Sequence, residues 1–216
     1  MIELIKEDFL AKGSHRNIYK YKDERDRCLK VVMPEGQKVL KQQNKHWYKK
    51  VRPTSWYNEN KKEIKAYKKL NKKNLEIFNY IPKFYGIVKT NLGNAMLIDY
   101  ITNSIPIGKY IKTYGLTNQL KEQLYEMFGV FYKNNVQIRD PHLDNCVIQI
   151  CENNKIKIKL IDGIGNSQLI PIADYVSCIG KKQLLKRIQK LFNNIYKEFP
   201  EYTNTLSLDY IKKYGN

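Results

Sequence analysis

The stretch Ile138-Arg139-Asp140-Pro141-His142-Leu143-Asp144-Asn145, followed by Leu160-Ile161-Asp162-Gly163, decides how this chain is expected to fold. An aspartate, a nearby asparagine and a second aspartate after a strand are the residues that phosphoryl transfer from ATP requires. We expect Asp140 to orient or deprotonate an attacking hydroxyl group, and Asn145 and Asp162 to bind Mg²⁺. A polar turn before an edge strand would give the same short pattern, because Asp-Gly is also a common turn dipeptide.

Two short β-branched segments, residues 146–150 and 156–161, separate the two motifs. The polar run Cys151-Glu152-Asn153-Asn154-Lys155 joins them, so the sequence predicts a β-hairpin. Because Asn145 enters this hairpin and Asp162 leaves it, we expect both metal ligands at one end of it.

Upstream of the hairpin, the chain predicts a β-rich region interrupted by one helix. The helix, over residues 58–73, places Glu63, Tyr67 and Leu70 on one face, since they are spaced at i, i+4 and i+7. β-branched and aromatic runs between turn residues predict strands at residues 9–11, 17–21, 27–32, 85–90 and 95–101.

Lys30 lies on the third of these strands between apolar neighbours, where its ammonium group could contact the α- and β-phosphates of ATP. An inward-facing lysine needs a counter-ion, and Glu63 on the apolar side of the helix is the natural candidate. Each residue alone would be an ordinary surface residue. Together with the Asp140 motif, the order of the residues is that of a protein-kinase-like fold.

The sequence therefore predicts an α+β, bilobal protein-kinase-like fold in a single domain of residues 1–216. Residues 1–98 would form a β-rich nucleotide lobe and residues 99–216 a reduced helical lobe. Apolar stripes at helical spacing over residues 120–131 and 184–195 support the helical half. Between the lobes, backbone groups of Asp99 and Ile101 are expected to meet adenine.

The loop between the first two strands matches a phosphate-binding loop poorly, because Gly13 is the only glycine in it. Ser14, His15 and Arg16 would then supply side-chain donors, with Arg16 assisting near the γ-phosphate. An ordinary hairpin turn fits the same residues equally well.

His142 lies two residues after Asp140, at a position suited to stabilising charge on the transferred phosphoryl group. Small-molecule kinases of the aminoglycoside and choline type often have a histidine there. A structural role, bonding a neighbouring carbonyl, is the alternative.

The chain is strongly basic, with 39 Lys and Arg against 21 Asp and Glu and a net charge of +18. Such an excess attracts polyanions, although a composition rich in Lys, Asn, Ile and Tyr also follows from AT-rich codons. The basic, aromatic insert at residues 34–57 could grip a phosphorylated or sugar-bearing acceptor, an anionic membrane surface or single-stranded nucleic acid. Alternatively, it is a solvated segment whose aromatic side chains pack on the small lobe.

No apolar run is long enough to span a bilayer, and the N-terminus lacks the layout of a secretory signal. The four cysteines form no Cys-x-x-Cys pair. We therefore expect a cytoplasmic protein with reduced thiols.

Several runs of the sequence resemble the YrbL-like proteins of the PhoP regulatory network: residues 10–19, 28–32, 81–86 and 165–171, together with Glu63 and Tyr67. The resemblance spans most of residues 8–172. It implies a kinase-like fold with Lys30, Glu63, Asn145 and Asp162 at the matching positions. Some relatives lack an aspartate in the place of Asp140, and this chain has one, which favours activity.

The hypothesis is an ATP- and Mg²⁺-dependent phosphotransferase. Asp162 is followed by Gly163-Ile164-Gly165 instead of Phe-Gly, and too little chain remains for the helical subdomain with which protein kinases dock peptides. The acceptor is therefore expected to be a hydroxyl group of a small molecule, sugar or lipid head group. The alternatives are a non-catalytic nucleotide-binding regulator and a basic nucleic-acid-binding protein.

Overall fold

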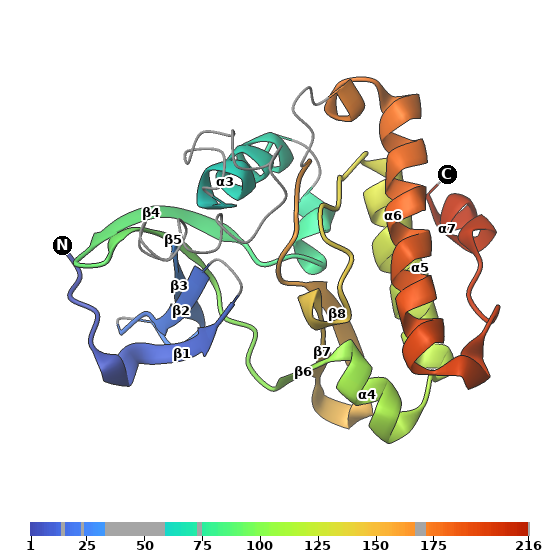
Figure 1. The fold of residues 1–216 in the computed structure, drawn as a ribbon, viewed down its shortest axis with the longest axis horizontal. Helices are drawn as coiled ribbons and strands as arrows, with labels where there is room; N and C mark the ends of the chain where they lie inside the picture. Colours follow the sequence, from blue (N-terminus) through green and yellow to red (C-terminus); the bar gives the residue numbers. More distant parts are fainter. Residues whose placement is uncertain (14–15, 23, 33–58, 73–74, 167–171, 216) are drawn as a thin grey trace, which may run out of the picture. The chain divides into compact units, whose positions relative to one another are not determined.

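The computed structural model describes residues 1–13, 16–22, 24–32, 59–72, 75–166 and 172–215. It is an α+β structure in which most strands lie in the N-terminal part and most helices in the C-terminal part (Figure 1). Two compact units are formed: the first by Met1–Ile64 and Lys83–Tyr100, the second by Lys65–Pro82 and Ile101–Asn216. Ser14, His15 and the basic insert at residues 34–57 fall outside the described residues.

A five-stranded antiparallel sheet organises the first unit, in the order β1-β2-β3-β5-β4. The strands are β1 (Phe9–Lys12), β2 (Arg16–Lys20), β3 (Arg27–Val32), β4 (Phe84–Thr90) and β5 (Gly93–Asp99). All five predicted strands are present, and β3 has the predicted bounds. The strand lies in the middle of the sheet, and its four central residues, Cys28 to Val31, are all buried.

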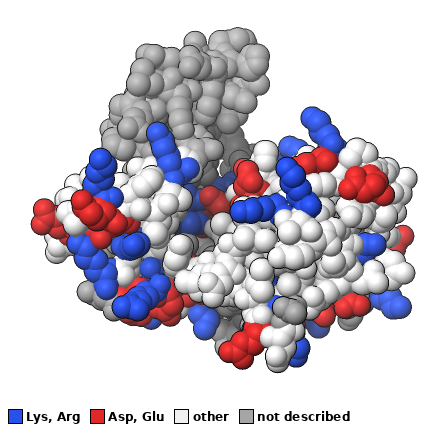
Figure 2. Space-filling model, turned by 90° about the horizontal axis from the view of Figure 1, so that it is seen from below, with Lys and Arg blue, Asp and Glu red and all other residues white. Residues whose placement is uncertain are grey.

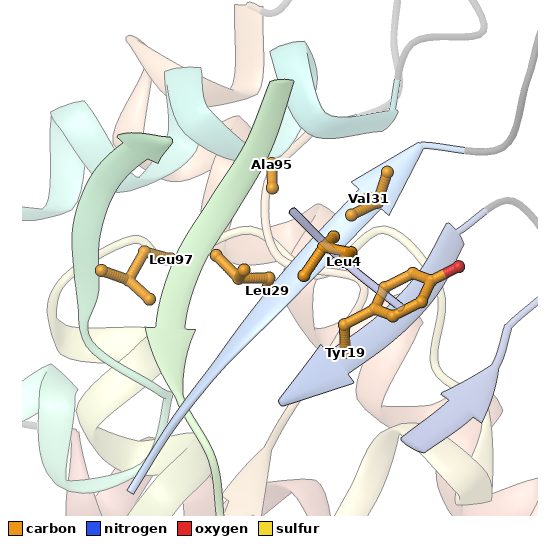
Figure 3. Close-up of a cluster of buried hydrophobic side chains, with 6 residues drawn as sticks. All are labelled: Leu4, Tyr19, Leu29, Val31, Ala95 and Leu97. Carbon is orange, nitrogen blue, oxygen red and sulfur yellow. The ribbon is translucent and has the colours of Figure 1, made fainter. Parts of the chain in front are cut away.

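The apolar core of this unit lies on one face of the sheet. Figure 3 shows the six side chains of the cluster, which come from the N-terminal segment, β2, β3 and β5: Leu4, Tyr19, Leu29, Val31, Ala95 and Leu97. Because side chains alternate along a strand, Lys30, between Leu29 and Val31, points to the opposite face.

Helix α3 (Glu59–Leu70) follows β3 in the described chain. Glu63, Tyr67 and Leu70 are all buried, so the helical face predicted from their spacing is confirmed. The helix begins in the first unit and ends in the second, since the division falls after Ile64.

In its described residues, the second unit combines a small antiparallel sheet with the end of α3 and four further α-helices. The sheet has the order β6-β7-β8, formed by β6 (Ser104–Pro106), β7 (Cys146–Ile150) and β8 (Ile156–Leu160). The predicted hairpin is therefore present as β7 and β8. The helices are α4 (Ile107–Tyr114), α5 (Asn118–Lys133), α6 (Ser177–Glu198) and α7 (Leu208–Tyr214).

Helix α5 is the centre of this unit, since it packs against β8, α6 and α7. Its stripe residues Leu120, Leu124 and Phe128 are fully buried, and so is Phe192 of α6. The Phe128 and Phe192 rings meet edge to face with their centroids 6.2 Å apart. The two apolar stripes predicted from the sequence are therefore core-facing. No helix in the described part of the chain is both long and apolar enough to cross a membrane.

Candidate functional site

In the first unit, the predicted ion pair between Lys30 and Glu63 is present. Lys30 Nζ lies 3.1 Å from Glu63 Oε1, with the lysine 5% exposed and the glutamate 0% exposed. Burying either charge alone would be costly, so each requires an opposite charge beside it. Glu63 of α3 therefore holds the ammonium group of Lys30, on β3, in one position.

The register of the sheet explains which residues meet here. Ile18 of β2 pairs with Lys30 of β3, and Arg16 pairs with Val32. Arg16 and Lys30 are thus diagonal neighbours on the same face, within reach of long side chains. Glu63 and Asn60 face them from α3, one helical turn apart.

Arg16 is the second cation on Glu63. It is 4% exposed, and its Nη1 contacts Glu63 Oε2 and lies 3.5 Å from Asn60 Oδ1. Asn60 Nδ2 donates to the Lys30 backbone oxygen at 3.0 Å. We call Arg16, Lys30, Asn60 and Glu63 the Glu63 cluster.

Sequence reasoning expected Arg16 near the γ-phosphate and did not find Asn60. The structure places the Arg16 guanidinium group on Glu63, and its phosphate role stays a prediction. Asn60 could have been noticed as a polar residue three positions before Glu63, on the buried side of the helix.

The backbone of Gly13 lies close to that of Arg16 at the start of β2. The Gly13 N–H donates to the Arg16 backbone oxygen at 2.8 Å, and a Cβ atom on Gly13 would lie 3.1 Å from that oxygen. Position 13 therefore favours glycine through close backbone approach. Its use as a phosphate-binding loop stays a prediction.

Asp99, predicted to meet adenine, ends β5. Its carboxylate accepts hydrogen bonds from the Lys83 N–H at 2.8 Å and from the Tyr85 hydroxyl at 2.6 Å. This hydrogen bond raises the pKa of Tyr85. The backbone oxygen of Ile101, the other predicted hinge residue, accepts from Ser104 Oγ at 2.8 Å. The Asp99 side chain thus holds the start of β4, and adenine recognition by either backbone stays a prediction.

In the second unit, residues 138–140, which we call the Asp140 segment, pair with residues 163–164, which follow β8. Ile138 and Ile164 form an antiparallel bridge, and Arg139 N donates to Gly163 O at 2.6 Å. Gly163 has a φ of +80°, which favours glycine. This pairing brings Asp140 beside Gly163. Because Asp162 precedes Gly163 in the chain, Asp140 and Asp162 come into the same region.

Asn145 and Asp162 lie at the same end of the β7–β8 hairpin, as the turn between the strands predicted. Cys146 pairs with Leu160, and Ile161 N donates to Asn145 O at 2.8 Å. Asn145 Nδ2 donates to Asp140 O at 2.9 Å. The hairpin and this amide therefore bring Asp140, Asn145 and Asp162 into one neighbourhood.

Asn145 and Asp162 are the predicted ligands of Mg²⁺, and their side chains carry oxygen atoms of the type that this cation binds. Because the Asn145 NH₂ group is used by Asp140 O, the amide oxygen is the atom available for a metal. Asp162 adds a carboxylate, of which Oδ1 accepts the Gly163 N–H at 2.5 Å. The described residues contain no group of three or more His, Cys, Asp or Glu able to hold a metal. Mg²⁺ is typically held by one or two carboxylates together with substrate phosphates, which fits this donor set.

His142 takes part in the same loop through its backbone. Its N–H donates to Asp140 O at 3.0 Å, and its own oxygen accepts from Asn145 N at 3.1 Å. The residue is exposed. Contact with a phosphoryl group stays a prediction for its imidazole.

A buried amide network supports the Asp140 segment, and sequence reasoning missed it. Gln137 is 5% exposed, and its Nε2 donates to Asn135 Oδ1 at 2.8 Å and to Gly180 O at 3.2 Å. Asn135 Nδ2 donates to Ala173 O at 2.9 Å. The network ties the start of α6 to the residues just before Ile138.

Surface charge is mixed rather than gathered on the face that Figure 2 shows. Lys and Arg side chains are spread over it, with Asp and Glu side chains among them. Among the described residues, the basic side chains therefore do not gather into a single patch on that face.

These features define an α+β protein with a buried lysine–glutamate pair in one unit and an aspartate–asparagine–aspartate hairpin in the other. The chain belongs to the family described as PhoP regulatory network protein YrbL, whose model matches residues 2–196. It is similar to the proteins named "Uncharacterized protein YrbL" of Escherichia coli (strain K12) and Shigella flexneri. Each is 24% identical over 195 residues, covering 86% of this chain and 84% of the relative. The resemblance seen in the sequence is confirmed at the level of the family.

Proposed function

We propose that this chain is an ATP- and Mg²⁺-dependent phosphotransferase with a kinase-like fold, acting on a hydroxyl group of a small molecule, sugar or lipid head group. The observation that carries the proposal is the buried pair of Lys30 and Glu63, 3.1 Å apart. A buried ion pair is weak evidence for stability, because the cost of removing both charges from water offsets their attraction. We therefore attribute the pair to binding of an anionic ligand rather than to stability.

Lys30 is the residue proposed to contact the α- and β-phosphates. Its ammonium group is held by Glu63 and needs no reorganisation when an anion arrives, which is how preorganised charges stabilise phosphoryl transfer. The strand-then-helix order of the two residues is that of kinase-like folds.

Asp140 is proposed to act on the acceptor. It accepts the proton of the acceptor hydroxyl while that oxygen bonds to the γ-phosphorus, and the bond from this phosphorus to the β–γ bridging oxygen breaks. The products are ADP and a phosphate monoester, and the proton later leaves Asp140 for water. Asp140 is exposed, so it is accessible to an acceptor.

Asn145 and Asp162 would hold Mg²⁺, which supplies positive charge against the phosphates when it is bound. They are oriented by the protein backbone, Asn145 through Asp140 O and Asp162 through Gly163 N. His142, exposed in the same loop, is proposed to stabilise the transferred group.

Calorimetric titration with ATP, with and without Mg²⁺, tests the nucleotide site. We expect Mg²⁺-dependent binding that Asp162→Asn loses, since this variant keeps an acceptor for Gly163 N but removes the charge. Asp144→Asn, an exposed aspartate in the same loop, is the matched control and should bind as the wild type does. Absence of ATP binding by the wild-type protein would refute the proposal.

Transfer itself is tested with γ-labelled ATP against panels of sugars, amino alcohols and lipid head groups. Asp140→Asn should bind ATP normally and lose transfer. Saturable ATP binding with no transfer to any acceptor would instead favour a nucleotide-binding regulator. That second candidate is motivated by the single glycine in the first loop and by Gly163-Ile164-Gly165 in place of Phe-Gly.

A further inference from the structure

We infer that Arg16 is a positioning residue: with Asn60 it clamps Glu63 and so holds Lys30 and the beginning of α3 in place before any nucleotide binds. The part of this inference that concerns Lys30 and phosphate rests on the proposed function. The clamp itself rests only on contacts within the first unit.

The geometry of Glu63 carries the inference. Its two carboxylate oxygens are divided between two strands: Oε1 faces Lys30 of β3 at 3.1 Å, and Oε2 contacts Arg16 of β2. A carboxylate held by one cation can rotate about it. Held by two cations from neighbouring strands, it is restricted to one orientation, and the helix that carries it is restricted as well.

Asn60 adds a second attachment one turn earlier on the same helix. Its Nδ2 donates to the Lys30 backbone oxygen at 3.0 Å, and its Oδ1 lies 3.5 Å from Arg16 Nη1. Both the backbone oxygen and the side chain of Lys30 thus join β3 to α3. All four residues of the Glu63 cluster are at most 5% exposed, so water competes little for these contacts.

The clamp also joins α3 to Gly13. Gly13 N donates to the Arg16 backbone oxygen at 2.8 Å, so the backbone of Arg16 holds Gly13 while its side chain holds the helix. A kinase-like site in which the helix moves away from the strand would lose the Lys30–Glu63 pair. Arg16 resists that movement, and the nucleotide-free protein is therefore preorganised.

The decisive measurement is hydrogen exchange of the α3 backbone amides in the nucleotide-free protein. Arg16→Met, which keeps an unbranched apolar stem but removes the guanidinium donors, should raise exchange in α3 by about tenfold or more. Arg16→Lys should restore part of the protection. The control Arg25→Met changes an exposed arginine in the β2–β3 turn and should leave α3 unchanged.

ATP and adenosine affinities, measured by calorimetry, separate positioning from general loosening. Arg16→Met should weaken ATP binding by about tenfold while adenosine binding is unchanged, because only ATP carries the phosphates that Lys30 is proposed to contact. Asn60→Ala, which removes no charge, should show the same pattern more weakly and serves if Arg16→Met does not fold. Equal α3 exchange in wild type and both folded variants would overturn the clamp. If the wild type binds no ATP, the proposed function fails, and α3 exchange alone still decides the clamp.

Discussion

The backbone of Gly163 lies directly against that of Asp140: a Cβ atom at position 163 would come within 3.0 Å of the Asp140 backbone oxygen and 3.2 Å of its nitrogen. Gly163 also has a φ of +80°, which L side chains rarely adopt. The close approach lets the chain after β8 pair with the Asp140 segment.

Replacing this glycine is expected to harm both stability and the site. Gly163→Ala should lower the free energy of unfolding by about 1–3 kcal/mol, because it combines backbone strain with a contact tighter than most Cβ atoms make. Urea denaturation followed by circular dichroism measures the change.

Gly93→Ala is the control for the strain alone. Gly93 has a φ of +104°, and nothing lies within 4 Å of its Cβ position. Gly93→Ala should lower the free energy of unfolding by less than Gly163→Ala does. Any ATP binding should be unchanged in Gly93→Ala. Equal losses in the two variants would mean that the Asp140 contact adds nothing.

Replacing Glu63 should lower the free energy of unfolding by more than replacing Lys30 does. Glu63→Gln takes the carboxylate away from two buried cations, Arg16 and Lys30, and is expected to destabilise the fold by about 3–5 kcal/mol. Lys30→Met leaves Glu63 its contact with Arg16 and fills a similar volume, so its cost should be clearly smaller.

The measurement is again the free energy of unfolding, with the Arg16→Met, Glu63→Gln double variant to complete a cycle. Because the two residues are in contact, their effects should not add. Additive effects would show that Arg16 and Glu63 are not coupled.

Two helix glycines should respond to alanine in opposite ways. A Cβ atom on Gly180 of α6 would lie 2.1 Å from Asn135 Oδ1 and 2.3 Å from Ala173 O, so Gly180→Ala must break the buried amide network. We expect a loss of about 3 kcal/mol or more. Thermal unfolding should show it as a marked drop in Tm.

Gly108→Ala in α4 is the counterpart. Its Cβ atom would meet its nearest neighbour, Glu198 Oε1, at 3.4 Å, and alanine favours the helix by about 0.5–1 kcal/mol. Tm should stay the same or rise. A rise for both variants would contradict the close packing at Gly180.

The buried thiols predict a loss of stability at high pH. Burial raises the pKa of Cys28 from its ordinary value of 9.0 to about 11, and that of Cys146 to about 12. Above pH 9 the unfolded chain loses these protons while the folded chain keeps them. The free energy of unfolding should therefore fall as the pH rises from 9 to 11, with no contribution from these groups below pH 9.

Thiol labelling checks the same burial directly. At pH 8, Cys178, which is exposed, should react quickly and Cys151, which is half-buried, more slowly. Cys28 and Cys146 should react only after denaturation. Replacing both buried cysteines by alanine should make the free energy of unfolding fall less steeply with pH above 9. An unchanged slope would show that other groups cause the pH dependence.

Much of the local structure could be predicted from the sequence, because it depends on neighbours along the chain. The strand predicted at residues 27–32 is β3, and the spacing of Glu63, Tyr67 and Leu70 predicted the buried face of α3. The β7–β8 hairpin followed from two β-branched runs and a polar turn. These patterns also predicted the Lys30–Glu63 pair, since an inward lysine needs a nearby acid.

Other features had no local signal. β6 is only three residues long and forms by pairing with β7, far along the chain, so no periodicity indicates it. The contact of Arg16 with Glu63 joins residues 47 positions apart, and Gly180 meets Asn135 across the second unit. Ser14, His15 and the basic insert are not among the described residues, so their predicted roles stay predictions.

The α+β composition, most of the strands and helices, the family, and the residue types of the candidate site could be inferred without coordinates. They follow from periodicity, turn chemistry and short motifs, which depend on residues close together in the chain. That Arg16 and Lys30 share one carboxylate, and that Gly163 lies against Asp140, is seen only in the folded chain. Those relationships depend on strand register and on backbones approaching within van der Waals distance, and residues far apart in the chain meet there only after folding.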